Sequence, residues 1–459
     1  MNEGYVVAYA GCSSVGYGFP EESLRRGVEM GADFLGCDAG SVDPGPYYLG
    51  TESTTKSKGS IRRDLHLLLT YAIRNGIPLI VGSAATSGKN WGVDWYASLI
   101  REIAAKENLS FKMALIYSEM DPKYVLDKLA QDKVEPLGSA PPLTPEDVRA
   151  SNHIVGMMGV EPFVEALRMG AQVIVAGRSS DTSIYAAIPL MRGIPRGLAW
   201  HAAKVIECGA AVAIPKSPDG MAAFLAPDHF IIETPNPDKV VRKTNVAAHT
   251  MYENLHPTIV HEPGGYLDTG TAVYEQLDDK RVKVSGSTFV EKDRYDIKLE
   301  GSALVGYRSA FIAGIRDDGL IDCIDDYIAE LRRSAAEKIR RVYGLEPDKY
   351  SIQTRVYGKN GVMAERETRR GEHYELGLLL DVVADTQETA DELLTLTRGL
   401  ALHQHFEGRL CNAGNLAFPY SPLGITLGPV YRFSVNHVVE IEDPLELFPI
   451  HIVDVNCSA

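Results

Sequence analysis

The chain has 459 residues, of which 45% are hydrophobic and 23% are charged, and its formal net charge is −15. This length allows two or three hydrophobic cores, and the acidic balance argues against nucleic-acid binding, which needs clustered Lys and Arg. No apolar run approaches the roughly 20 residues of a membrane helix, and the N-terminus lacks the features of a signal peptide. We therefore expect a cytoplasmic protein without nucleic-acid or membrane partners.

Short apolar segments alternate with amphipathic segments over residues 1–215. This alternation predicts a largely parallel sheet covered by helices on both faces. The predicted strands are 5–10, 32–37, 78–81, 112–117 and 172–176. The predicted helices are 21–31, 61–75, 95–106 and 163–169, with a further helical stretch beginning at 145.

The pattern changes near residue 227. Residues 227–316 carry β-rich runs that predict an antiparallel meander, and residues 325–343 have the apolar spacing of a helix. Strands predicted at 350–357, 374–383 and 431–439 and a helix at 388–402 indicate an α+β unit of the split βαβ type. The predicted fold class is α/β, with a mostly parallel sheet and flanking helices in the N-terminal half, an antiparallel β-rich middle and a C-terminal α+β unit. The predicted domains are 1–226, 227–320 and 321–459.

Each of the five predicted strands of the N-terminal half ends in a loop rich in Gly, Ser, Thr or Asp. These loops are 11–18, 37–46, 82–90, 118–121 and 177–182. Parallel strands place their carboxyl ends at one edge, where open α/β sheets bind ligands. The sequence therefore predicts a polar, glycine-lined pocket at this edge.

The residue types in these loops suit a small anionic substrate. Lys89 and Arg178 could bind a carboxylate or phosphate, although ordinary surface charge is the alternative. Hydroxyl groups that could donate hydrogen bonds to such a ligand are those of Ser13, Ser83, Ser87 and Ser179. Neither GxxxxGK[ST] nor a clean GxGxxG occurs, so no cofactor motif is evident.

Four carboxylates are candidates for catalysis: Asp38, Asp43, Glu119 and Asp181. Neighbouring carboxyl groups in a partly dry pocket titrate as a pair and can transfer protons near neutral pH. They could equally bind Mg²⁺, which needs only one or two carboxylates and substrate oxygens. As connectors, they would simply cap nearby backbone amides.

Two further polar clusters lie outside these loops. Residues 243–265 contain three histidines and two glutamates without a standard zinc spacing, so metal binding, substrate contact and structural hydrogen bonding all stay open for His249 and Glu262. Residues 411–422 contain Asn412 and Asn415, which could bind a substrate carboxylate or hold their own loop together.

Several long motifs resemble the acyclic terpene utilisation protein A (AtuA-like) family. They are GCDAGSVDPGPYYLG at 36–50, AGRSSDT at 176–182, AAHTMYEN at 247–254, EPGG at 262–265, YEQLDDKRVKVSGS at 274–287 and CNAGNLAFPYSP at 411–422. The resemblance implies a role in catabolism of branched acids and terpenoids. Some members are labelled methylaspartate ammonia-lyase or glutamate mutase, but the cobalamin signature DxHxxG is missing here, which counts against a mutase.

Together these features lead us to expect a lyase of the hydro-lyase (hydratase) type that acts on a small branched hydroxy acid or its CoA thioester. An isomerase of the same substrates, and a non-catalytic binding or scaffold subunit, are the alternatives. Because some members of the family work beside a short separate protein, a small partner subunit is compatible with the resemblance. We also expect a homo-oligomer.

Overall fold

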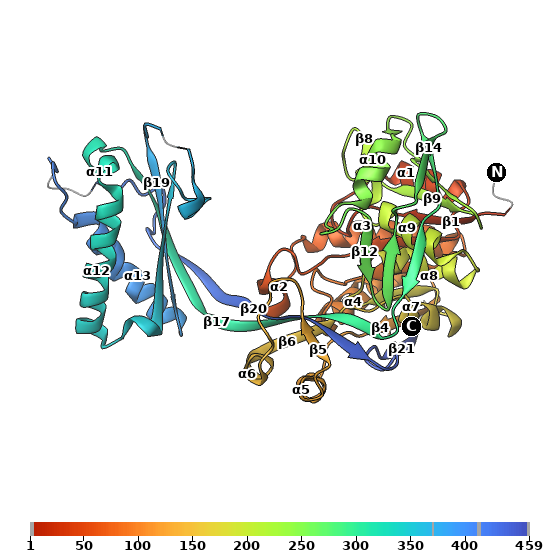
Figure 1. Cartoon of the computed structure of the whole chain (residues 1–459), viewed down its shortest axis with the longest axis horizontal. Helices are drawn as coiled ribbons and strands as arrows, with labels where there is room; N and C mark the ends of the chain where they lie inside the picture. The colour runs from red at the N-terminus through yellow and green to blue at the C-terminus, as the bar shows by residue number, and fades with distance from the viewer. Residues whose placement is uncertain (1–3, 370, 411–414, 457–459) are drawn as a thin grey trace. The chain divides into compact units, whose positions relative to one another are not determined.

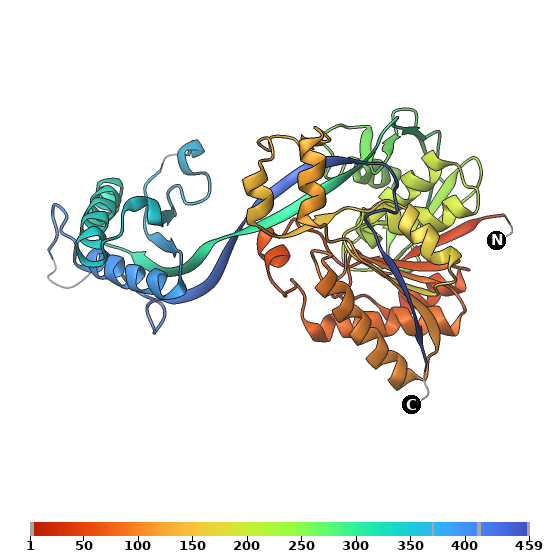
Figure 2. The same cartoon turned by 90° about the horizontal axis from the view of Figure 1, so that it is seen from below.

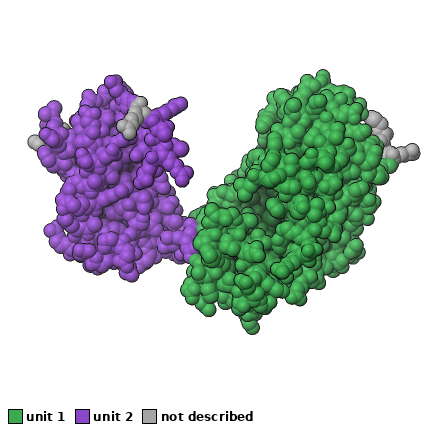
Figure 3. Space-filling view, viewed as in Figure 1, with its two compact units in different colours: residues 1–303, 433–459 green, residues 304–432 purple. Residues whose placement is uncertain are grey.

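The computed structural model describes residues 4–369, 371–410 and 415–456 (Figure 1). The chain divides into two compact units, which Figure 3 colours separately: unit 1 is 1–303 with 433–459, and unit 2 is 304–432. The three domains predicted with boundaries after residues 226 and 320 stay a prediction. Among the described residues, no helix combines the length and apolar character needed to cross a membrane.

Unit 1 is built on a ten-stranded mixed sheet with the order β14-β15-β10-β9-β1-β2-β3-β7-β4-β21. Its centre is parallel: β1 (Val6–Ala10), β2 (Phe34–Asp38), β3 (Leu79–Gly82), β7 (Val173–Ala176) and β4 (Phe111–Ile116). Antiparallel strands extend both sides: β9 (Met221–Leu225), β10 (Phe230–Glu233), β15 (Arg281–Ser285), β14 (Val273–Gln276) and β21 (Ile450–Val455).

Helices cover both faces of this sheet, as Figure 2 shows. Alternate residues of β1 belong to different cores: Val7 and Tyr9 pack with α3 (Lys58–Arg74) and α4 (Asn90–Glu107), whereas Ala8 and Ala10 pack with the helices of the other face. That other layer contains α7 (Glu161–Arg168), α8 (Asp181–Met191) and α9 (Arg196–Ile206). Successive side chains of a strand point to opposite faces, so a doubly covered sheet is apolar throughout.

The remaining elements of unit 1 are short. Its other helices are α1 (Glu21–Glu29), α2 (Pro46–Gly50), α5 (Pro122–Ala130), α6 (Pro145–Ala150), η1 (Gly209–Val212) and α10 (Lys243–Thr250). Its other strands are β5 (Val134–Pro136), β6 (Ser151–Gly156), β8 (Ala213–Ile214), β11 (Val240–Val241), β12 (Ile259–Glu262), β13 (Gly265–Asp268) and β16 (Thr288–Glu291). The strands β12, β13 and β16 form a small antiparallel sheet.

Unit 2 has its own antiparallel sheet and core. Two long strands enter it, β17 (Tyr295–Ile315) and β20 (Ile425–Ile441), and β17 lies between β19 (Leu376–Ala384) and β20. The strand β18 (Tyr350–Tyr357) pairs with β19. The helices α11 (Asp318–Asp322), α12 (Ile324–Tyr343) and α13 (Gln387–His403) complete the unit with the short η2 (Pro347–Lys349) and η3 (Ala364–Arg366). The sheet order β18-β19-β17-β20 is that of the split βαβ motif.

The structure confirms the predicted mixed α/β class, with a large mixed sheet and flanking helices. In the described part of the chain, six helices were not predicted: the short α2, α5, α10 and α11, and the longer α8 and α9. Residues 182–189 of α8 and 197–206 of α9 are buried throughout, so neither helix has the polar face whose periodicity marks a surface helix.

Candidate functional site

The carboxyl ends of the five parallel strands meet at one edge of the sheet, where a cavity of about 530 Å³ opens. Backbone hydrogen bonds join the loops there: Ala39 N donates to Gly82 O at 3.0 Å, and Thr86 N donates to Ala39 O at 3.1 Å. The sequence-predicted residues that line the cavity are Ser13, Asp38, Asp43, Asp181 and His249. It is also lined by Tyr17, Lys56, Thr86, Cys208, Lys216, Asp219, Tyr252 and Glu253.

Asp38 is the last residue of β2, and its side chain is only 5% exposed. Its Oδ2 accepts a hydrogen bond from Gly40 N at 2.8 Å, whereas Oδ1 has no hydrogen-bond partner among the described residues. Burial, and then the charge of Asp181, raise the pKa of Asp38 well above its usual value. One oxygen of this carboxyl group is therefore held by the loop, and the other is left for a ligand.

Asp181 is the first residue of α8 and lines the same cavity. Burial raises the pKa of its carboxyl group to about 6, although the charges of Arg178 and Lys204 oppose this effect. Arg178 Nη1 lies 3.7 Å from Asp181 Oδ1, and Arg178 Nε donates to Glu300 Oε2 at 2.7 Å. The negative charge of Asp181 is one cause of the raised pKa of Asp38, so ionisation of Asp181 disfavours ionisation of Asp38.

Two lysines bring positive charge to the cavity. Lys56 Nζ lies 3.5 Å from the centre of the Tyr17 ring, a cation–π geometry that restrains its ammonium group. Lys216 belongs to the loop before β9, and Lys239 Nζ holds this loop by donating to Pro215 O at 2.6 Å and to Ser217 Oγ at 2.7 Å. A substrate carboxylate could bind these lysines while its other end contacts the aspartates.

The loop after β3 packs closely against the loop after β2, and several of its residues have positive φ. Ser83, Ala85 and Thr86 all have positive φ, a strained conformation for residues other than glycine. A Cβ atom on Gly40 would lie 2.3 Å from the Cα of Thr86, so only glycine allows the two loops to approach this closely. The position of Asp38 thus depends on this contact.

Seven of the sequence-predicted residues lie outside the cavity lining: Ser83, Ser87, Lys89, Glu119, Arg178, Ser179 and Glu262. Glu119 accepts hydrogen bonds from Asn90 N at 2.8 Å and from His153 Nδ1 at 2.6 Å, so it caps α4. Burial raises the pKa of Glu119, but these hydrogen bonds outweigh that effect and leave the pKa below its usual value. Lys89 is 1% exposed, and burial lowers the pKa of its ammonium group.

Glu262 binds the two residues that flank Asp181 in the chain. Its carboxylate accepts hydrogen bonds from Ser180 Oγ at 2.5 Å and from Thr182 Oγ1 at 2.6 Å, the residues that flank Asp181. Burial raises the pKa of Glu262 to about 7 despite these hydrogen bonds. Glu262 therefore positions the start of α8.

Of the two asparagines of the predicted C-terminal cluster, only Asn415 belongs to the described residues, and it does not line this cavity. Asn415 lines another cavity, of about 790 Å³, within unit 2, where Arg316 and Glu375 are further lining residues. Asn412 lies outside the described residues. A groove of about 560 Å³ in unit 1, lined by α7 and the segment after β20, contains neither Asp38 nor Asp181.

Sequence reasoning missed several lining residues. Lys56, Lys216 and Asp219 stand in loops that are not predicted strand ends, and no local pattern distinguishes them from surface charge. Cys208 is partly exposed and lines the cavity, and no spacing to another cysteine or histidine marks it in the sequence. Tyr252 and Glu253 belong to the mid-chain polar cluster, which was the available signal for them.

Part of the chain is similar to a known protein family. No curated protein and no solved structure matches the chain. Residues 55–214 match the family model described as "Acyclic terpene utilisation family protein AtuA". This segment includes β3, β4, β7 and α8, the motif at 176–182 and the cavity residues Lys56, Thr86 and Asp181. Over this segment the match bears out the resemblance to the AtuA-like family.

Proposed function

We propose that the protein is a lyase of the hydro-lyase (hydratase) type that acts on a small branched hydroxy acid or its CoA thioester. The family assignment implies involvement in acyclic terpene utilisation and suggests a catabolic enzyme. The single observation that carries the reaction type is that two carboxyl groups with raised pKa values, those of Asp38 and Asp181, line one cavity.

Such a pair suits dehydration and hydration. Elimination of water from a β-hydroxy acid removes a proton from the carbon next to the carbonyl group and donates a proton to the departing hydroxyl group, so that a carbon–carbon double bond and one water molecule form. Two interacting carboxyl groups that share one proton near neutral pH provide a base and an acid at the same time. We assign these two roles to the pair without assigning either role to one residue.

The residues proposed to bind the negative charge of the substrate differ from Lys89 and Arg178, which the sequence suggested. In the proposal, Lys56 and Lys216 bind the carboxylate or thioester end, and Ser13 donates a hydrogen bond. Arg178 Nη1 instead lies 3.7 Å from Asp181 Oδ1, and its positive charge lowers the pKa of Asp181 and so favours the ionised carboxylate. The oxygen atoms of Asp38, Asp43 and Asp181 could also hold Mg²⁺ beside the substrate, which would polarise the carbonyl group.

The test is turnover of a panel of branched β-hydroxy acids, their unsaturated products and their CoA thioesters, with and without Mg²⁺. Asp38→Asn and Asp181→Asn should each lower turnover by about 10²–10⁴-fold, the usual contribution of a general acid or base, and should retain substrate binding. Conversion of a substrate without loss of water would instead favour an isomerase. Tight binding with no turnover of any compound would contradict the enzyme and favour a scaffold.

We also propose that the protein is a cytoplasmic homo-oligomer that could require a short partner subunit. Size-exclusion chromatography with light scattering tests the oligomer, and the panel should be repeated with the candidate partner present before the scaffold is accepted.

A further inference from the structure

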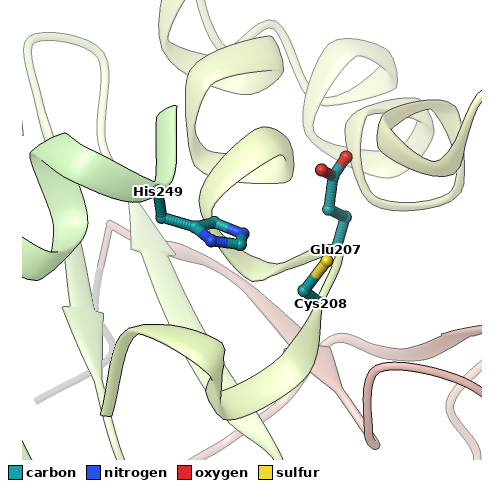
Figure 4. Close-up of side chains that lie close together, drawn as sticks. All are labelled: Glu207, Cys208 and His249. Carbon is teal, nitrogen blue, oxygen red and sulfur yellow. The ribbon is translucent and has the colours of Figure 1, made fainter. Parts of the chain in front are cut away.

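Three side chains with metal-binding atoms lie close together: Glu207, which is buried, and Cys208 and His249, which line the cavity (Figure 4). One ligand atom from each residue lies within 4.8 Å of the other two. Glu207 and Cys208 follow α9 directly, whereas His249 is on α10. The fold thus brings together residues about 40 positions apart in the chain, without any local sequence motif.

His249 has a free ligand atom that points into this group. The imidazole is 9% exposed, and its Nε2 is buried without a hydrogen-bond partner in the described part of the chain. The ring stacks on Tyr252, with ring centres 5.4 Å apart and planes 11° apart, so its orientation is set. A buried nitrogen without a partner loses hydration without compensation, and binding a metal would satisfy it.

Cys208 supplies a sulfur atom to the same space. Cys208 is a free cysteine that is partly exposed and lines the cavity. Figure 4 shows its side chain beside that of His249. A thiol that only filled space would normally be fully buried among apolar groups. Cys208 is instead within reach of an ion that enters from the cavity.

Glu207 is the third candidate ligand, and Lys204 forms a hydrogen bond with its carboxylate. Lys204 Nζ donates to Glu207 Oε1 at 2.6 Å, so the other carboxylate oxygen, Oε2, is the atom that we assign to the metal. Lys204 also interacts electrostatically with Glu262, and Glu207 interacts with Asp181. Glu207, Glu262 and Asp181 thus all interact electrostatically with the ammonium group of Lys204.

We propose that Glu207, Cys208 and His249 bind a divalent transition metal ion, with Zn²⁺ as the best match to their chemistry. Sulfur and imidazole nitrogen are ligands of Zn²⁺, whereas Mg²⁺ takes oxygen ligands almost exclusively. Three protein ligands would leave a fourth position of a tetrahedral ion open, and two of these ligands, Cys208 and His249, line the cavity that contains Asp38 and Asp181. Three-ligand zinc sites with an open position are those that take part in catalysis.

This site is independent of the proposed hydratase. Metal binding would stand if no hydroxy acid were turned over, and acid–base catalysis by the aspartates would stand if no metal bound. The measurement is therefore binding of the metal alone.

The experiment uses the purified full chain, stripped of metal by a chelator and titrated with Co²⁺. Bound Co²⁺ should give a cobalt–thiolate charge-transfer band in the near-ultraviolet that Zn²⁺ removes and Mg²⁺ does not. Cys208→Ser should abolish the band, and His249→Ala should weaken Co²⁺ binding by more than about ten-fold. Cys323→Ser is the matched control, because this partly exposed cysteine is in unit 2, and it should leave the titration unchanged.

A wild-type protein without the band, or an unchanged band in Cys208→Ser, overturns the proposal. Circular dichroism must show that each variant is folded. If Cys208→Ser does not fold, anomalous diffraction at the zinc edge decides with the wild-type protein: an ion between the three side chains supports the site, and an ion elsewhere or none overturns it.

Discussion

Arg178 Nη1 and Asp181 Oδ1 lie 3.7 Å apart, and the same guanidinium group donates to Glu300 Oε2 at 2.7 Å. Arg178 thus connects a cavity carboxylate to a buried carboxylate of β17. Its own burial lowers the pKa of the guanidinium group, but the charges of Glu300 and Asp181 outweigh that effect and raise it. The residue is held by two partners rather than presented to a ligand.

Loss of this arginine should therefore destabilise the protein. Arg178→Met leaves Glu300 buried without one of its partners, and we expect the free energy of unfolding to fall by about 3–5 kcal/mol. The double variant Arg178→Met/Glu300→Gln should recover part of this loss, because the stranded charge is removed. Urea unfolding measures both, and equal losses in the single and double variants would exclude the pairing.

Asp38→Asn should separate function from stability. We expect turnover to fall by about 10²–10⁴-fold, while the melting temperature at pH 8 does not fall, because the substitution removes a charge that burial disfavours. Asp64→Asn is the matched control: Asp64 is fully buried and accepts hydrogen bonds from Gly16 N at 2.8 Å and Gly18 N at 2.9 Å. That substitution should cost about 1–3 kcal/mol of stability. A lower melting temperature in Asp38→Asn would point to a structural role.

Stability should decrease with rising pH near neutrality. Asp181 and Glu262 have pKa values of about 6 and 7 in the folded protein, above those of the unfolded chain, so folding takes up protons between these limits. Their contribution is complete below about pH 4 and is lost as the pH rises through 6 to 7. Glu262 faces Ser180, Thr182, Lys204 and Asp181.

Glu262→Gln tests this pH dependence. Unfolding by urea between pH 6.5 and 8, where most histidines are already neutral, should show a smaller decrease in the variant than in the wild type. An identical pH profile in both proteins would show that Glu262 does not change its protonation on folding.

The two cavity lysines should affect substrate binding more than the chemical step. Lys56→Met and Lys216→Met should each raise KM for an anionic substrate by about ten-fold or more with little change in kcat, because hydrogen bonds to charged groups contribute about 1.5–3 kcal/mol. Lys106→Met, an exposed lysine near the end of α4, is the control. A fall in kcat without a change in KM would place the lysines in the chemical step instead.

Gly40→Ala should lower activity more than an equally strained substitution nearby. The new Cβ would lie 2.3 Å from Thr86 Cα and displace the loop that carries Asp38, and displacements of about 1 Å can cost about 10²-fold in rate. Gly45→Ala is the control, since Gly45 also has positive φ but would meet nothing within 4 Å. Steady-state kinetics of both variants checks this, and equal activities would show that strain rather than the clash matters.

The sequence by itself determined the strand ends. Alternating apolar and amphipathic segments located the parallel strands, and their polar loops placed Ser13, Asp38, Asp43 and Asp181 at one edge, because parallel strands share the direction of their carboxyl ends. The AtuA-like motifs also came from the sequence, and the family match over residues 55–214 agrees with them.

Only the tertiary structure decided which polar groups face the cavity. Lys89 and Arg178 follow strands as the aspartates do, yet neither lines the cavity, since orientation depends on packing against partners such as Glu300 that are distant in the chain. The helices α8 and α9 lack a polar face because they are enclosed on all sides, so their pattern could not reveal them. Glu207, Cys208 and His249 meet only because α9 and α10 pack together, a long-range contact that no local spacing encodes.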